Sequence, residues 1–336
     1  MHRGILKDIK ELDSYANVQK SIRIALQECT FLWLNNFSEL DELNNNIDVS
    51  QATRNHLKEI KNTVKNSFEK KFIYFICSRK MIRFDPSKQP RFTISRKSMK
   101  FSIVIDNSVR RSIFVPRANL IFSLGQTGEI VEISKISVTQ TSVIFDFENN
   151  QDLTMGVHDF LKIFGINLGI SNKVEYIGLT VNPEKRPFNL SHSGLSRVLL
   201  GNNNKKKFRD YFICYNLFEV SISSEQKLGF DFFIGNSWLN EIDIATEADI
   251  IEKSLILYFG SGYQDKTKTN DYSSLKNNLK QILEAANIND IHFHYEINGG
   301  NPDYISFYSD LVKPAIKHYF TIKLDENTIN MENEIN

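Results

Sequence analysis

Residues 174–186, which read VEYIGLTVNPEKR, carry the pattern that decides the fold of the second half of this 336-residue chain. The run opens with β-branched and aromatic residues, which favour a strand, and Gly178 is a residue type that ends one. Tyr176 and Arg186 stand ten residues apart, on either side of the turn-forming pair Asn182-Pro183. The stretch predicts a strand, a turn and a cationic side chain just beyond it.

A second pattern lies downstream, where Glu252 precedes Leu255-Ile256 in a helical stretch and Tyr263 follows. Cleavage of a phosphodiester bond needs a base, a cation that stabilises phosphate charge and a carboxylate that holds a metal ion. Tyr176, Arg186 and Glu252 supply these three kinds of group. If the three side chains converge in space, the chain is a nuclease.

Together the two segments resemble the core of the GIY-YIG nuclease family, and the domain that this implies covers roughly residues 155–325. The resemblance implies that Tyr176 is a general base or positions the attacking water, and that Arg186 holds the scissile phosphate. It also implies that Glu252 binds Mg²⁺, with water molecules completing the shell. His192 follows Arg186 and could take a proton or contact phosphate.

Two positions depart from the family pattern. The family's first strand carries Gly-Ile-Tyr a short distance before Tyr-Ile-Gly, whereas Gly165-Ile166-Asn167 stands at that offset here. Pro187 follows Arg186 directly and keeps it out of the middle of a helix. The general base is therefore open between Tyr176 and His192. The alternative is a nuclease-like fold with impaired catalysis that acts as a nucleic-acid-binding or regulatory module.

A block of basic residues precedes these motifs. Residues 70–117 contain thirteen Lys or Arg, against only Asp85 and Asp106 as acids, so the block carries +11 although the whole chain carries +1. Such a block suits phosphate backbones, and a solvated face balanced by acids elsewhere is the alternative. The resemblance favours DNA over RNA as the partner. We expect nucleic acid to contact Arg91, Arg96, Lys97 and Lys100.

The spacing of apolar residues predicts an α+β protein. Apolar residues recur every three or four positions over 5–34 and 50–70, which predicts two helices, and short runs rich in Ile, Val, Phe and Thr then predict antiparallel strands. The expected division is 1–70 for an N-terminal helical segment, 71–150 for a basic β-rich module, 151–325 for a GIY-YIG-like α/β domain with a small central sheet, and 326–336 for a frayed tail.

Composition argues against several other classes of protein. The three cysteines are widely spaced, which favours reduced thiols and a cytoplasmic location over disulfides or a zinc site. No signal-peptide core and no apolar run of about 20 residues is visible, so no membrane partner is expected. His292 and His294 alternate along a predicted strand without a third ligand nearby, which favours a polar sheet face over a metal site. The sequence leaves the oligomeric state open.

Overall fold

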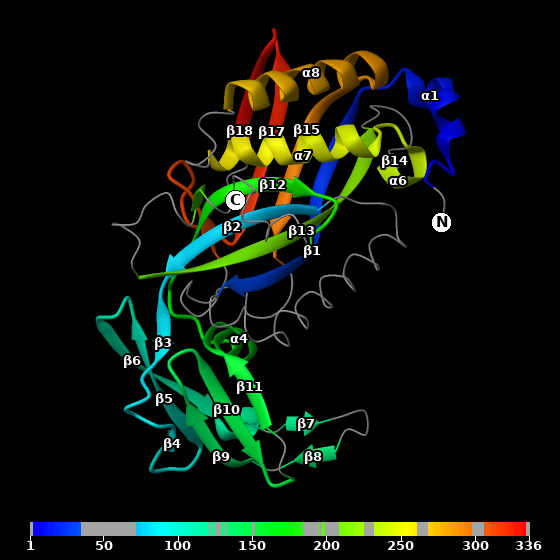
Figure 1. Cartoon of the computed structure of the whole chain (residues 1–336). Helices are drawn as coiled ribbons and strands as arrows, with labels where there is room; N and C mark the ends of the chain where they lie inside the picture. The colour runs from blue at the N-terminus through cyan, green and yellow to red at the C-terminus, as the bar shows by residue number, and fades with distance from the viewer. Residues whose placement is uncertain are drawn as a thin grey trace.

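The structure, a computed structural model, has a mixed α+β fold, as the sequence predicts (Figure 1). A large sheet carries helices on one face, and a smaller β-rich module lies at one end of the sheet. None of the helices in the described part of the chain is long and apolar enough to cross a membrane. The described residues are 3–34, 72–120, 122–124, 129–131, 133–149, 152–183, 194, 197–198, 208–224, 232–260, 268–297 and 306–333.

Nine strands form the large sheet in the order β16-β12-β2-β13-β1-β15-β17-β18, with β14 added beside β13. Neighbouring strands are antiparallel except in two parallel pairs, β1 with β15 and β12 with β16. The strands are β1 (Lys20–Leu34), β2 (Phe72–Lys80), β12 (Asn172–Thr180), β13 (Arg209–Ser224), β14 (Phe232–Gly235), β15 (Ile288–Glu296), β16 (Phe307–Tyr308), β17 (Lys317–Asp325) and β18 (Thr328–Asn333).

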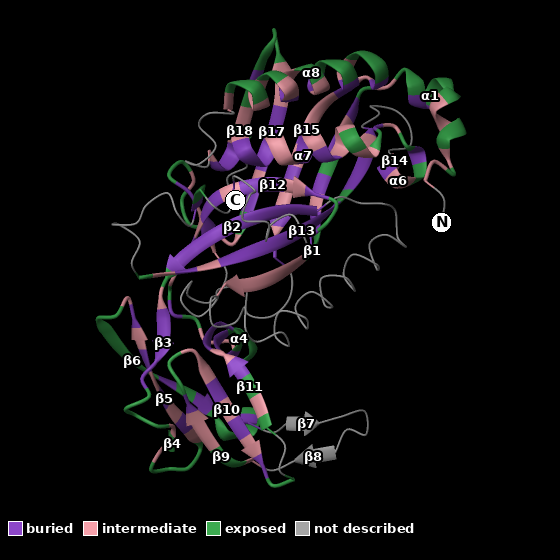
Figure 2. Cartoon of the chain, viewed as in Figure 1, coloured by how far each residue is buried: buried purple, intermediate pink, exposed green. Residues whose placement is uncertain are grey.

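Two long helices, α7 (Ile244–Phe259) and α8 (Lys268–Ala286), lie side by side on one face of this sheet. The ring of Phe259 meets Phe75 of β2 edge to face at 5.6 Å, and the ring of Tyr258 stacks on Phe320 of β17 at 4.1 Å. Buried residues fill the layer between helices and sheet (Figure 2). The short η1 (Lys7–Glu11), α1 (Asp13–Ala16) and α6 (Asn236–Leu239) lie at one end.

The smaller module is the chain between β2 and β12. Its first sheet pairs β3 and β4 with one edge of β5 and β6 with the other, its second has the order β11-β10-β9, and β7 pairs with β8. The elements are β3 (Ile82–Phe84), β4 (Arg91–Phe92), β5 (Ser98–Ile105), β6 (Val109–Pro116), η2 (Arg117–Leu120), β7 (Phe122–Leu124), β8 (Glu129–Val131), β9 (Ile133–Val138), β10 (Ser142–Phe147), β11 (Asp152–Gly156) and α4 (Val157–Ile163).

Helix α4 supplies both the core of the module and its link to the large sheet. The ring of Phe160 packs on Phe101 at 4.7 Å and on Phe84 at 5.4 Å. On the other side, the imidazole of His158 stacks on Trp33 of β1 at 3.7 Å and donates from Nε2 to Asp210 of β13 at 2.8 Å. The module is therefore attached through polar and aromatic contacts as well as through the chain itself.

The helix predicted over 5–34 is wrong, because the second half of this stretch is the long strand β1. Ile22, Ile24 and Leu26 are buried while the residues between them are more exposed, which is the two-residue period of a strand. A spacing of four residues, as between Ile22 and Leu26, fits a strand as well as a helix. Ile24, halfway between them, is also buried, which fits a strand, whereas in a helix it would point away from Ile22 and Leu26. The helix predicted over 50–70 lies outside the described residues.

The large sheet also differs from the predicted small one, because it takes strands from all four predicted segments. Strand β2, expected in the basic module, is an inner strand of the large sheet. The tail expected to fray forms β18, which pairs with β17 through residue Asn333. Ile329 is buried there, and its backbone N–H donates to Tyr272 Oη of α8 at 3.1 Å. The polar composition of the tail does not indicate that Ile329 is buried.

Candidate active site around a tyrosine cluster

Strand β12 carries Tyr176-Ile177-Gly178, as the sequence predicts, and pairs along its length with β2. The pairing skips Glu175, because Val174 faces Cys77 and Tyr176 faces Ile76. This bulge resets the alternation of side chains along the strand. Ile177 then points to the face that α7 covers, since its partner Phe75 contacts Phe259.

Tyr176 points to the opposite face of the sheet, where it meets two other tyrosines. Its ring lies 6.0 Å from that of Tyr74 on β2, and the ring of Tyr74 lies 6.5 Å from that of Tyr215 on β13. We call Tyr74, Tyr176 and Tyr215 the tyrosine cluster. They pack with buried apolar residues of β2 and β13, and a Cβ added to Gly178 would lie 2.6 Å from the ring of Tyr74. Glycine is therefore required beside that ring.

A tyrosine from a distant part of the chain, Tyr74, lies beside Tyr176. Gly165-Ile166-Asn167, at the expected offset, follows α4 in a turn where the N–H of Ile166 donates to Leu161 O at 2.8 Å. The strand beside β12 is instead β2, which carries Phe72-Ile73-Tyr74. The sequence does not indicate that β2 pairs with β12, because the whole smaller module lies between these two strands in the chain.

The segment that holds Arg186 and His192 lies outside the described residues, but its two ends are placed. At one end, Tyr215 Oη donates to the carbonyl oxygen of Pro183 at 2.9 Å. At the other, a Cβ on Gly194 would lie 2.8 Å from Tyr176 Cζ. Both ends of the segment therefore rest on the tyrosine cluster.

Glu252 lies on α7 and is half-buried. Asp243 caps the start of the helix, and the buried residues of the helix, including Ile251 and Leu255, face the sheet. Since α7 covers one face of the sheet and Tyr176 points to the other, the structure brings Tyr176 to Tyr74 but does not bring it to the helix of Glu252, which lies across the sheet. Within the described ranges, no group of three or more His, Cys, Asp or Glu side chains could hold a metal ion.

Buried charges lie at the end of β2 nearest the module. Asp210 accepts from Arg83 Nη1 and from His158 Nε2, both at 2.8 Å. Burial, together with the nearby charges of Arg79 and Arg83, lowers the pKa of His158 to about 4 despite the bond to Asp210. Burial alone would raise the pKa of Asp210, but His158 and Arg83 outweigh it and hold that pKa below its usual value. The network is thus an ionised carboxylate beside a neutral imidazole, and it joins the two parts of the fold.

The residues predicted to bind nucleic acid lie together in the smaller module. Arg91 of β4 pairs with Lys100 of β5, and Arg96 and Lys97 lie in the turn between these strands. Lys100 is half-buried and the other three are exposed. Two other cations of the basic block, Arg79 and Arg83, are buried, so its formal charge overstates what solvent meets.

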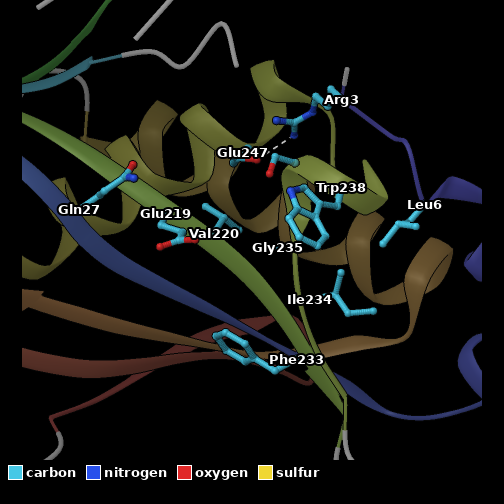
Figure 3. A pocket seen from close by; sticks show the side chains of 11 residues that line it. Arg3, Leu6, Gln27, Glu219, Val220, Phe233, Ile234, Gly235, Trp238 and Glu247 are labelled. Atoms are coloured by element: carbon cyan, nitrogen blue, oxygen red, sulfur yellow. Dashed lines mark hydrogen bonds and ion pairs between the residues drawn. The ribbon is translucent and has the colours of Figure 1, made fainter. Parts of the chain in front are cut away.

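A cavity of about 370 Å³ lies at the other end of the large sheet (Figure 3). Trp238 and Phe233 form two of its walls, and Glu219 lies between Gln27 and Trp238. Arg3 closes one side through an ion pair with Glu247 at 2.8 Å.

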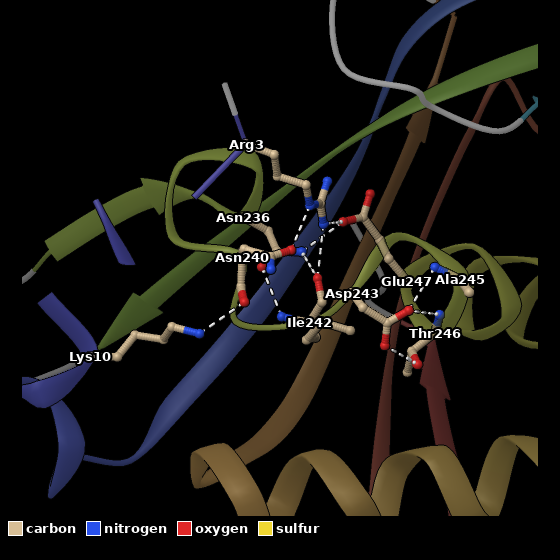
Figure 4. A network of polar contacts seen from close by, with 9 residues as sticks. All are labelled: Arg3, Lys10, Asn236, Asn240, Ile242, Asp243, Ala245, Thr246 and Glu247. Atoms are coloured by element: carbon tan, nitrogen blue, oxygen red, sulfur yellow. Dashed lines mark hydrogen bonds and ion pairs between the residues drawn. The ribbon is translucent and has the colours of Figure 1, made fainter. Parts of the chain in front are cut away.

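The same arginine ties the N-terminal segment to the start of α7 (Figure 4). Arg3 also donates to Asn240 Oδ1 at 2.7 Å and to the carbonyl oxygen of Ile242 at 2.8 Å, while Asn236 Nδ2 donates to Glu247 Oε2 at 2.6 Å. The cavity is therefore bounded by a satisfied polar network, which no sequence pattern indicated.

No family model, curated protein or solved structure matches the chain.

Proposed function

We propose that the chain is a metal-dependent endonuclease that hydrolyses phosphodiester bonds in nucleic acid, with DNA favoured by the resemblance to GIY-YIG nucleases. One observation carries the proposal. The strand with Tyr176-Ile177-Gly178 pairs antiparallel with a strand that carries Ile73-Tyr74, so two tyrosines from distant segments lie side by side. The sequence lacks a tyrosine just upstream of β12, and on this proposal Tyr74 of β2 takes its place.

Each candidate residue has a role in this proposal. Tyr176 orients or deprotonates the attacking water, with Tyr74 beside it and His192 as the alternative base. Arg186 contacts the scissile phosphate and stabilises the charge that develops on it. Glu252 would hold Mg²⁺, which when bound lowers the pKa of water and neutralises phosphate charge. Among the described residues no group of three or more His, Cys, Asp or Glu side chains could hold that ion, so ligands besides Glu252 would be water and substrate oxygens.

A second candidate function is nucleic-acid binding without cleavage. It is favoured by the position of α7, because the helix of Glu252 and the ring of Tyr176 are on opposite faces of the sheet. On this alternative the cations of the smaller module carry the function, and the tyrosine cluster is core packing.

Plasmid nicking with Mg²⁺, measured beside DNA binding, distinguishes the two candidates. We expect the parent protein to nick and Glu252→Ala to bind equally well but not nick. Glu284→Ala, an exposed glutamate of α8, is the matched control and keeps full activity. A parent protein that binds DNA and never nicks it supports the binding function and overturns the nuclease.

A further inference from the structure

The first sheet of the smaller module has one face that packs in the core, here called the dry face, and one face that is open to solvent. On the dry face, Met99, Phe101 and Ile103 of β5 are buried against α4 and its surroundings. The intervening residues, Lys100 and Ser102, point the other way. We call this open side the basic face; it comprises Arg91, Lys100, Ser102, Arg110, Ser112 and Phe114.

The register places cations and an aromatic ring in one row of the basic face. Arg91 pairs with Lys100, which in turn pairs with Phe114. Directly paired side chains of neighbouring strands lie within about 5.5 Å at Cβ. Phe114 is 54% exposed, although a strand residue that faces solvent is usually polar. The row is thus an exposed ring with two cations beside it.

Further apolar side chains are exposed nearby. Phe92 follows Arg91 at the edge of the sheet, is 47% exposed, and has the guanidinium of Arg117 5.5 Å from its ring centre, but it pairs with Met99 and so points to the other face. Ile94 is fully exposed in the turn that also carries Arg96 and Lys97. On the basic face, Phe114 therefore lies beside cations without a continuous apolar patch around it.

We propose that the basic face binds single-stranded nucleic acid, with a base stacked on Phe114 and phosphates held by the neighbouring cations. An aromatic ring offers stacking to any base, and cations along the backbone path supply affinity without reading sequence. A duplex keeps its base faces covered and offers Phe114 nothing to stack on. An anionic membrane would need a broader apolar surface than these separate side chains provide. The inference rests on the proposed function, because it names the form of its substrate.

Fluorescence anisotropy with an oligothymidine and with a duplex of equal length tests this inference on the full chain. Phe114→Ala should weaken oligothymidine binding about tenfold, the loss of one stacked base, and leave the dependence on salt unchanged. Arg91→Gln with Lys100→Gln should weaken binding and also make the dependence on salt shallower, because fewer counterions are released. Phe233→Ala, an equally exposed ring on the large sheet, is the control and should bind like the parent protein.

Three results would overturn the inference: Phe114→Ala binding oligothymidine like the Phe233 control, equal losses for duplex and single strand, or binding only to phosphatidylserine vesicles. The nuclease proposal is scored separately by nicking. A protein that binds single strands through Phe114 and never cuts retains the basic face and loses the nuclease. A protein that cuts while Phe114→Ala binds normally retains the nuclease and loses this inference.

Discussion

At the residue scale, the glycine that ends the Tyr-Ile-Gly pattern, Gly178, is required by a close contact. Its strand partner is Tyr74, and an added Cβ would lie 2.6 Å from both Cζ and Oη of that buried ring. Gly178→Ala should therefore lower the free energy of unfolding by about 1–3 kcal/mol, a typical cost of overpacking. Urea denaturation measures the loss. In a Tyr74→Leu background the same substitution should cost clearly less, and equal costs in both backgrounds would contradict this close contact.

Two buried histidines give the stability of the protein a dependence on pH. Burial lowers the pKa of His158 and of His318 to about 4 each, whereas an unfolded histidine has a pKa near 6.5. Between these values the unfolded chain binds more protons. Stability is therefore complete above pH 6.5 and is lost as the pH falls towards 4, by up to about 1.4 kcal/mol per pH unit for each histidine.

Urea titrations between pH 7.5 and 4.5 test this expectation. His318→Asn keeps a hydrogen-bonding group near Tyr258, whose hydroxyl lies 3.1 Å from His318 Nδ1. We expect this variant to lose part of the acid sensitivity over that range. An unchanged slope would show that His318 does not titrate in this way.

At the scale of elements, helix α7 depends on its N-cap residue, Asp243. Asp243 Oδ1 accepts from the backbone N–H groups of Ala245 at 2.8 Å and Thr246 at 3.1 Å. Asp243→Ala leaves these donors without the cap and should cost about 0.5–2 kcal/mol, whereas Asp243→Asn should retain most of the stability. Thermal unfolding of the two variants compares them directly, and similar melting temperatures would show that the cap contributes little.

Local pattern predicted many of the elements but not how they pair. Short apolar runs of the predicted β-rich module form strands such as β10, and the helical stretch predicted around Glu252 lies within α7. Strand β1 was missed because apolar residues spaced four apart fit the period of a strand as well as that of a helix. Strand β18 was missed because the burial of Ile329 and the hydrogen bond that its N–H donates to Tyr272 Oη make no sequence pattern.

The candidate site was predictable only in part for the same reason. Tyr176 lies on the predicted strand and Glu252 on the predicted helix. The pairing of β12 with β2 was not predictable, because strand partners far apart in the chain are chosen by tertiary packing rather than by local periodicity. Tyr74 therefore escaped notice although Phe72-Ile73-Tyr74 stood in a predicted strand.

At the scale of the whole molecule, one sheet unites both ends of the chain, and the smaller module is inserted between two neighbouring strands of it. The insertion keeps Tyr74 and Tyr176 adjacent while it sets the cations of the basic face at a distance from them. Cutting and holding would then occur on different parts of the molecule, and each could be lost without the other.

Cleavage by tyrosine variants measures the central claim most directly. Supercoiled and single-stranded circular DNA would be incubated with Mg²⁺ and the parent protein, Tyr176→Phe, Tyr74→Phe, or Tyr308→Phe as a control on β16. We predict cleavage by the parent and the control, and a loss of about 100-fold or more for Tyr176→Phe with DNA binding and melting temperature unchanged. Cleavage by Tyr176→Phe and Tyr74→Phe at the parental rate, or none by the parent, would contradict the account.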